Sequence, residues 1–199
     1  GAPLFQLFGR IFTLFAAQGT SEVAVAINIM SALCSSFTIL FLFWTITAFG
    51  RKMFFKDEKN IEFGRIIAVL GSGLIGALAY TFSDSFWFSA VEGEVYAMSS
   101  LFTAITFWCI MKWEQEADKP HASRWLVLIG YLIGLSVGVH LLSLLTIPAM
   151  GMIYYFKKYE YTKTGAIKDG LGAAFAFVSS MVILGLVQGV IIPGAVSLI

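Results

Sequence analysis

Long apolar stretches alternate with short charged loops along this chain. A helix that crosses the hydrocarbon core of a bilayer needs about 20 apolar residues. Uncharged runs close to that length occupy residues 23–50, 66–83, 95–111 and 171–192. The pattern predicts that each of these four runs forms a membrane-spanning helix.

A fifth run, residues 125–156, has no charged side chain apart from the titratable His140 and is too long for a single crossing. At 1.5 Å per residue it would be about 48 Å long, whereas the hydrocarbon core is about 30 Å thick. We therefore predict two short spans that turn near Gly138–His140. The expected fold class is all-α, a single polytopic transmembrane bundle over residues 1–199 with six spans within 23–192.

The first residues predict a helix of a different kind. Residues 3–17 are apolar but too short for a comfortable crossing, so we expect an amphipathic helix that lies along the outer membrane surface. Gly19-Thr20-Ser21-Glu22 then supplies a turn and a cap for the first span. The interfacial segment is thus assigned to residues 1–22.

Composition supports a membrane protein. The chain is 58% hydrophobic and only 13% charged, whereas soluble domains carry about 25% charged residues. No basic stripe with interleaved aromatic residues is present, which argues against nucleic-acid binding. Cys34 and Cys109 lie inside apolar runs and are interpreted as small buried hydrophobic residues.

The placement of charge predicts the sidedness of the bundle. Twelve of the 13 lysine and arginine residues lie within 51–65, 112–124 and 157–169. Six spans put all three loops on one side, which the positive-inside rule makes cytoplasmic. A single span over 125–156 would move the last loop across the membrane, so charge also favours two spans there.

Small and polar residues predict how the helices pack. Polar residues in the first span form a stripe that should face the bundle interior, because lipid disfavours them. Small residues four apart should let helices approach closely in two other spans. The stripe is Asn28, Ser31, Ser35, Thr38 and Thr45, and the small-residue faces are Ala68, Ser72 and Gly76 in one span and Gly130, Gly134 and Gly138 in another.

Candidate chemistry collects on the opposite, outer side. Glu92 and Glu94 precede the third span, and Gly93 between them suggests a bend. Carboxylates there either complement a helix N-terminus, worth about 0.3–1 kcal/mol, or accept a proton from an acceptor hydroxyl. No charged side chain lies in the middle of a span, which argues modestly against an ion-coupled transporter.

Five further residues complete the candidate set, as donor- or acceptor-binding groups. His140 lies at the predicted outer turn, where it is either a structural turn residue or a binding group. Arg10 is the only outer cation, and either binds a phosphate or snorkels to the lipid headgroups. Asn28, Trp87 and Tyr96 lie at the same side, and Trp87 suits the headgroup region. We assign no metal ligands.

Four segments carry a resemblance to a known family. Residues 1–10, 28–33, 86–97 and 134–142 resemble the bacterial membrane DUF family numbered twenty-seven twenty-three. Its eukaryotic relatives are protein O-mannosyltransferases of the endoplasmic reticulum, within the GT-C class of polytopic glycosyltransferases. The resemblance implies a polyprenyl-phosphate sugar as donor and a protein Ser/Thr hydroxyl as acceptor. The sequence itself indicates no cofactor and leaves the need for a divalent metal open. The resemblance further implies a multi-pass protein of the bacterial inner membrane with a periplasmic active face.

The same resemblance implies roles for particular residues. Pro3 would open an amphipathic helix that follows an essential acidic motif, and that motif would lie upstream of Gly1, so we expect the chain to be a fragment. Glu94, or else Glu92, matches the place of a second acidic residue, and Arg10 and His140 match family motif positions. Two alternatives stay open from the residues alone: a transporter or flippase for a lipid-linked sugar, and a non-catalytic membrane scaffold.

Overall fold

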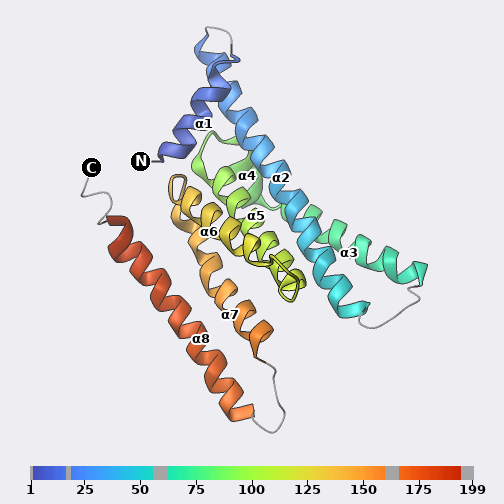
Figure 1. Cartoon of the computed structure of the whole chain (residues 1–199). Coiled ribbons are helices and arrows are strands. Elements are labelled where there is room, and N and C mark those ends of the chain that lie inside the picture. The colour runs from blue at the N-terminus through green and yellow to red at the C-terminus, as the bar shows by residue number, and fades with distance from the viewer. Residues whose placement is uncertain (1, 17–18, 56–61, 160–165, 194–199) are drawn as a thin grey trace.

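The computed structural model describes residues 2–16, 19–55, 62–159 and 166–193, and within them every regular element is helical. The all-α prediction is therefore confirmed (Figure 1). In chain order the elements are α1 (Pro3–Thr13), α2 (Thr20–Phe54), α3 (Phe63–Thr81), α4 (Asp84–Val91), α5 (Val95–Glu116), α6 (Ser123–Val137), the 3₁₀ helix η1 (Leu141–Leu145), α7 (Thr146–Lys158), α8 (Ala166–Leu186) and the π-helical turn η3 (Val187–Ile191).

Four helices among the described residues are long and apolar enough to cross a membrane. They comprise 21–54, 63–81, 95–116 and 170–190, so the chain is a multi-pass membrane protein. The long run after residue 124 is indeed broken, because α6 ends at Val137 and α7 begins only after η1. With 15 residues, α6 is about 22 Å long, and six remains an approximate count of the spans.

The long helix α2 organises the outer end of the molecule. Its 35 residues give a length of about 52 Å, more than the hydrocarbon core requires. The first turns of α2 extend beyond the bundle, and α1 packs against them (Figure 1). Gly9 makes this approach possible, since a Cβ there would lie 3.1 Å from Cδ1 of Ile27. The predicted start of α1 at Pro3 is confirmed.

Helix α3 packs antiparallel on the other end of α2. A Cβ on Gly73 would lie 2.6 Å from Cγ2 of Thr47, and one on Gly50 would lie 2.9 Å from Cγ1 of Val69. These glycines let the two backbones approach closely, as expected for helices in lipid.

The small-residue faces were predicted only in part: of the α3 set, Gly76 marks a close approach, since a Cβ there would lie 2.9 Å from Cδ1 of Ile46 on α2. Ala68 and Ser72 are exposed, because the face of α3 that meets α2 lies one residue further on. A Cβ added to Gly130 or Gly134 would meet no described atom within 4 Å, so among that set only Gly138 marks a close approach. A repeat of small residues thus identified the helices that pack, but not reliably the faces.

Helix α5 lies at the centre and packs on α2, α6 and α7. Two clusters of buried side chains hold it. The outer core cluster is Met30, Cys34, Ala97, Met98 and Val139, and the second cluster is Cys109, Ile110, Trp113 and Ile129. Both cysteines are buried and free. Helix α8 packs on α7 along one flank, opposite α3 (Figure 1).

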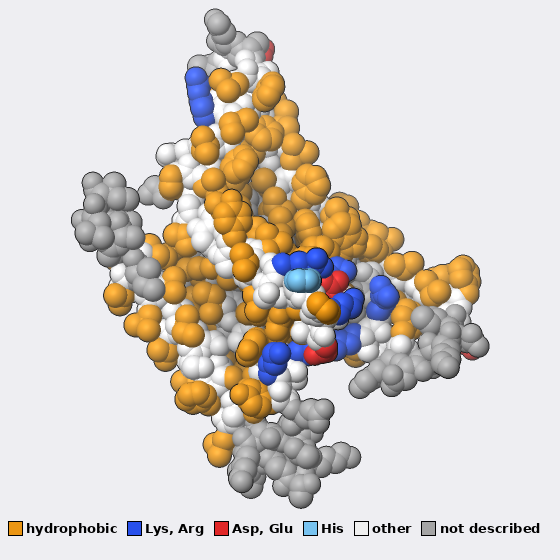
Figure 2. All heavy atoms as spheres, viewed as in Figure 1, with side chains coloured by type: hydrophobic (Ala, Val, Ile, Leu, Met, Phe, Trp, Pro, Cys, Tyr) orange, Lys and Arg blue, Asp and Glu red, His pale blue; other side chains and the backbone are white. Residues whose placement is uncertain are grey.

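The polar stripe of the first span faces inward, as predicted, with one exception. Ser31, Ser35, Thr38 and Thr45 are buried, whereas Asn28 is exposed. The side chain of Asn28 lies beside the loop between α4 and α5, since a Cβ on Gly93 would lie 3.3 Å from its Oδ1. The face seen in Figure 2 is largely apolar, and its charged side chains gather mainly over the ends of α2 and α5.

Candidate functional site

Four segments that are distant in the sequence converge at the outer end of the bundle. They are α1, the first turns of α2, the loop between α4 and α5, and the turn between α6 and η1. The outer core cluster takes residues from α2, α5 and the turn, and Leu4, Phe5 and Phe12 of α1 pack against it. The candidate residues of the sequence therefore stand on a common apolar support.

A backbone hydrogen bond joins α1 to the turn that carries His140. The N–H of Leu4 donates to the carbonyl oxygen of Gly138 over 2.8 Å. A Cβ on Gly138 would lie only 3.0 Å from Cβ of Leu4, so glycine is needed for this approach. The start of α1 and the end of α6 are consequently fixed against each other.

His140 and Tyr96 come together just beyond this contact. Nδ1 of His140 accepts a hydrogen bond of 3.2 Å from the N–H of Leu142, which caps η1. Because Nδ1 is the acceptor, the proton of the neutral ring is on Nε2. The ring of Tyr96 lies 5.5 Å from the imidazole, centroid to centroid. His140 therefore stabilises the turn through Nδ1, and its Nε2–H remains a hydrogen-bond donor for a ligand.

The two glutamates flank a glycine that is pressed against α2. A Cβ on Gly93 would lie 2.7 Å from Cγ2 of Ile27 and 3.3 Å from Oδ1 of Asn28. Glu94 is the N-cap residue of α5, but its side chain makes no capping hydrogen bond. Both carboxylates are exposed. The structure thus places the loop that carries Glu92 and Glu94 beside Asn28, and both side chains are open to a ligand.

Two of the candidate residues stand apart from this group. Arg10 is exposed on α1, and within the described part of the chain no carboxylate forms an ion pair with it. Trp87 on α4 is half exposed and stacks on Phe82, with ring centroids 6.2 Å apart. The structure therefore brings together Asn28 with the glutamates, and Tyr96 with His140, but does not join Arg10 or Trp87 to either group.

A largely apolar pocket with a few hydroxyl-bearing residues lies between α2, α3, α5 and η1, and the sequence did not reveal it. Its volume is about 330 Å³. The polar lining comes from Thr38, Thr45, Tyr80, Ser100 and Thr103, and Leu142, two residues after His140, also lines it. Ser100 and Thr103 are three residues apart on α5, which is a helical spacing. The helical spacing of these two residues was the sequence signal that could have indicated the pocket.

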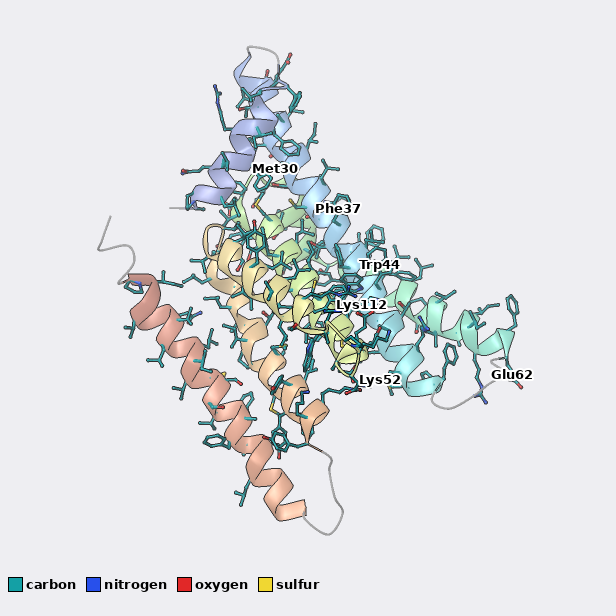
Figure 3. The ribbon with its side chains drawn as sticks, in the orientation of Figure 1. Met30, Phe37, Trp44, Lys52, Glu62 and Lys112 are labelled. Carbon is teal, nitrogen blue, oxygen red and sulfur yellow. The ribbon has the colours of Figure 1, made fainter. Side chains whose placement is uncertain are left out.

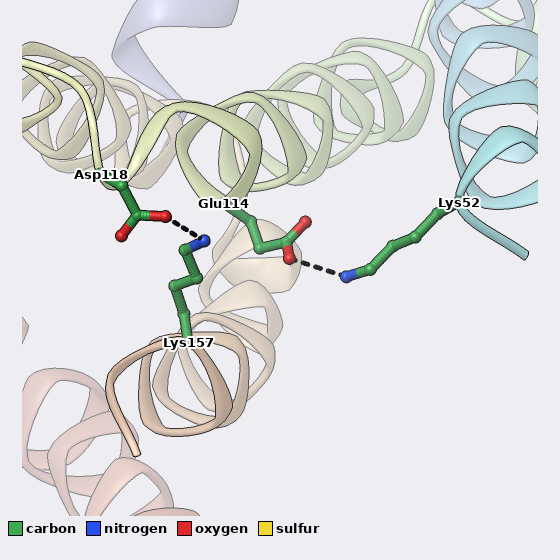
Figure 4. A network of polar contacts seen from close by, with 4 residues as sticks. All are labelled: Lys52, Glu114, Asp118 and Lys157. Atoms are coloured by element: carbon green, nitrogen blue, oxygen red, sulfur yellow. Dashed lines mark hydrogen bonds and ion pairs between the residues drawn. The ribbon is translucent and has the colours of Figure 1, made fainter. Parts of the chain in front are cut away.

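The opposite end of the bundle is held by ion pairs (Figure 4). Nζ of Lys52 lies 2.7 Å from a carboxylate oxygen of Glu114, and Nζ of Lys157 lies 2.6 Å from Asp118. The hydrogen bond from Lys157 holds the pKa of Asp118 below its ordinary value. The described residues of the three basic loops thus do meet at one end, as the charge pattern predicted.

No cluster of three or more His, Cys, Asp and Glu side chains suited to a metal ion occurs in the described ranges. The chemistry of the outer end therefore has to be argued from carboxylate, imidazole, amide and hydroxyl groups.

Comparison with known proteins gives these residues a context. The model of the family described as "Protein O-mannosyl-transferase TMEM260 N-terminal domain" matches residues 1–163. The chain belongs to the TMEM260 N-terminal domain family. The protein O-mannosyl-transferase tmem260 of Dictyostelium discoideum is 25% identical over 158 residues, which cover 74% of this chain and 17% of that protein. No solved structure matches the chain.

The TMEM260 N-terminal match bears directly on the site. It covers α1 to α7 and contains every candidate residue, whereas α8 follows it. The resemblance to protein O-mannosyltransferases is thereby confirmed as a family relationship. The chain spans about a sixth of the length of its Dictyostelium relative, so the match concerns one part of a much larger enzyme.

Proposed function

We propose that this chain is the N-terminal membrane part of a GT-C glycosyltransferase that transfers a sugar from a polyprenyl phosphate to a protein Ser/Thr hydroxyl. The active face is the side opposite the lysine- and arginine-rich loops, which is the periplasmic side of a bacterial inner membrane. The single observation that carries the proposal is the exposed carboxylate of Glu94 at the start of α5, which makes no capping hydrogen bond among the described residues, in a member of an O-mannosyltransferase family.

In the proposed reaction the carboxylate of Glu94 accepts the proton of the acceptor hydroxyl. The hydroxyl oxygen bonds to the anomeric carbon as the bond from that carbon to the phosphate oxygen breaks. The polyprenyl phosphate leaves with the electron pair, and the sugar is transferred with inversion. Hydrogen-bond donors that meet the departing phosphate lower the barrier. Nε2–H of His140 is the donor we assign to that role.

Glu94 is a better base than Glu92 because of its position. Its backbone is the N-cap of α5, whose next turns are buried at Ala97 and Met98. Tyr96, two residues later on the same helix, contacts His140. Glu92 instead closes the short helix α4. A carboxylate carried by the central helix has a constant position relative to Tyr96 and His140, and catalysis depends on such positioning.

The test uses the full-length protein reconstituted in vesicles, with radiolabelled polyprenyl-phosphate mannose and a Ser/Thr peptide on the outer side. Loss of a general base lowers rates by about 10²–10⁴-fold. We expect that loss for Glu94→Gln, while Asp84→Asn, which removes an exposed carboxylate from α4, leaves the rate within about twofold. Equal rates for Glu94→Gln and the parent protein would remove Glu94 from the reaction. Donor movement across the vesicle without transfer would instead indicate a flippase.

A further inference from the structure

A basic pocket opens between α2, α5 and α7, at the far end of the bundle from Glu94. Its volume is about 630 Å³. Four cationic side chains and two tryptophans among its lining residues define it: Arg51, Lys52, Lys112, Lys157, Trp44 and Trp108. Figure 3 shows Trp44, Lys112 and Lys52 at this end of α2 and α5, with Met30 toward the other end.

The basic pocket carries an excess of positive charge. Within the described part of the chain its only acidic lining residue is Glu114, which pairs with Lys52 at 2.7 Å. Lys157 is neutralised by Asp118 at 2.6 Å. Among the described residues, no carboxylate forms an ion pair with Arg51 or Lys112. Two cations therefore remain to attract an anion, and a phosphate accepts hydrogen bonds from both kinds of side chain.

Lys112 is held in place by the aromatic lining. Its Nζ lies 5.4 Å from the ring centroid of Trp108, within the range of a cation–π interaction. Trp108 in turn contacts Trp44 and Trp125, with centroids 5.8 Å and 6.1 Å away. The charge of Lys112 is thus positioned by a packed cluster rather than carried on a free surface chain.

The depth of the basic pocket indicates what kind of phosphate it holds. Along α2, Trp44 is about 12 Å from Lys52, and along α5, Trp108 is about 6 Å from Lys112. Tryptophan is enriched where headgroups meet acyl chains. The cations therefore form the rim of the pocket near the helix ends, and the tryptophans lie about one to two helical turns further toward the middle of the bundle. A free phosphate would use the rim alone, whereas a lipid uses both.

We propose that the basic pocket binds the phosphate headgroup of an anionic membrane lipid, with the phosphate between Arg51 and Lys112 and an acyl chain along Trp44 and Trp108. The rim belongs to the loops that the charge pattern puts on the cytoplasmic side, where anionic lipids attract basic clusters. A lipid in this place bridges the ends of α2 and α5. This site is separate from the proposed transfer site and does not depend on it.

The test is native mass spectrometry of the full-length protein in detergent, titrated with dioleoyl phosphatidylglycerol or with dioleoyl phosphatidylcholine. We expect the protein to retain phosphatidylglycerol in preference. Lys112→Gln and Arg51→Gln should each weaken its binding about tenfold, as expected for loss of one charge-assisted contact. Lys119→Gln is the matched control, because Lys119 is exposed on the same side and does not line the pocket. It should change binding by less than about twofold.

Three results would overturn the proposal. The first is equal retention of the two lipids, and the second is an equal loss of affinity for Lys119→Gln and Lys112→Gln, which would show diffuse attraction. The third is displacement of phosphatidylglycerol by excess inorganic phosphate, which would show that the pocket recognises a free anion. Thermal unfolding without added lipid verifies that each variant is folded, and Arg51→Gln carries the test if Lys112→Gln is not.

Discussion

The N–H of Leu4 donates a hydrogen bond to the carbonyl of Gly138, over 2.8 Å, and so joins the first helix to the turn that carries His140. This contact links α1 to the α6–η1 turn at the outer end of the bundle. It places α1, whose exposed face is rich in apolar side chains, against the same turn whose histidine meets Tyr96. The geometry of the candidate site therefore depends on α1 being docked.

Gly138→Ala should loosen this docking. The new Cβ would lie 3.0 Å from Cβ of Leu4, which cannot rotate away. Overpacking of this kind costs about 1–3 kcal/mol. We expect a lower thermal midpoint in detergent and faster proteolysis within α1. Gly134→Ala is the control, because nothing in the described chain lies within 4 Å of its Cβ position. It should leave stability unchanged or raise it, and equal effects of the two changes would contradict the account.

Gly93→Ala should disturb the loop that carries both glutamates. Its Cβ would lie 2.7 Å from Cγ2 of Ile27, so the loop has to move away from α2. We expect sugar transfer to fall about tenfold or more, since small displacements of catalytic groups cost orders of magnitude in rate. Ile27→Ala removes the clashing methyl group, so the double variant should recover part of the loss. Strict additivity in that double-mutant cycle would show that the clash is not the cause.

The ring of Tyr96, rather than its hydroxyl group, should matter for His140. The two rings lie 5.5 Å apart, and aromatic pairs contribute about 0.5–1.5 kcal/mol beyond their buried area. Tyr96→Phe should therefore keep transfer within about threefold, whereas Tyr96→Ala should lower it by about tenfold. Tyr131→Ala, at an exposed position on α6, serves as the control. A loss as large for Tyr96→Phe as for Tyr96→Ala would assign the role to the hydroxyl group.

Acid should weaken the link between α7 and the end of α5. Lys157 lowers the pKa of Asp118 in the folded protein. The pair therefore stabilises the fold fully above the pKa of Asp118 in the unfolded chain, about 4. That stabilisation is lost as the pH falls through the lower folded pKa. The difference in thermal midpoint between the parent protein and Asp118→Asn should be present at neutral pH and vanish in strong acid. A difference in thermal midpoint that grows as the pH falls would contradict the lowered pKa of Asp118.

The sequence predicted the helices, and the meeting of the described basic-loop residues at one end of the bundle, better than the contacts between helices. The break near Gly138–His140 followed from length and charge, and the start of α1 followed from Pro3. The face of α3 was predicted only in part because small residues recur four apart on two faces that point about 100° apart, one with Ser72 and Gly76 and the other with Gly73 and Ala77. A period in one helix carries no information about the partner helix that approaches it.

The candidate site was predicted as a set of residues but not as an arrangement. Its place at the end of the bundle opposite the basic loops followed from charge, whereas the pairing of Tyr96 with His140, and of Gly93 with Asn28, depends on contacts between distant segments. The basic pocket was not predicted, because it too depends on contacts between distant segments. Its cations come from three helices, and the charge pattern marked them only as loop residues.

The central claim is that the outer constellation and the basic loops lie on opposite membrane faces, and cysteine labelling tests it most directly. Cys34 and Cys109 are buried, so a membrane-impermeant maleimide should report mainly on introduced thiols. In vesicles with the non-cytoplasmic face outward, we predict that Asp84→Cys is labelled at once and that Lys119→Cys is labelled only after detergent is added. Labelling of both positions from the same side, or in the reverse order, would contradict the account and remove the proposed site from the acceptor's side.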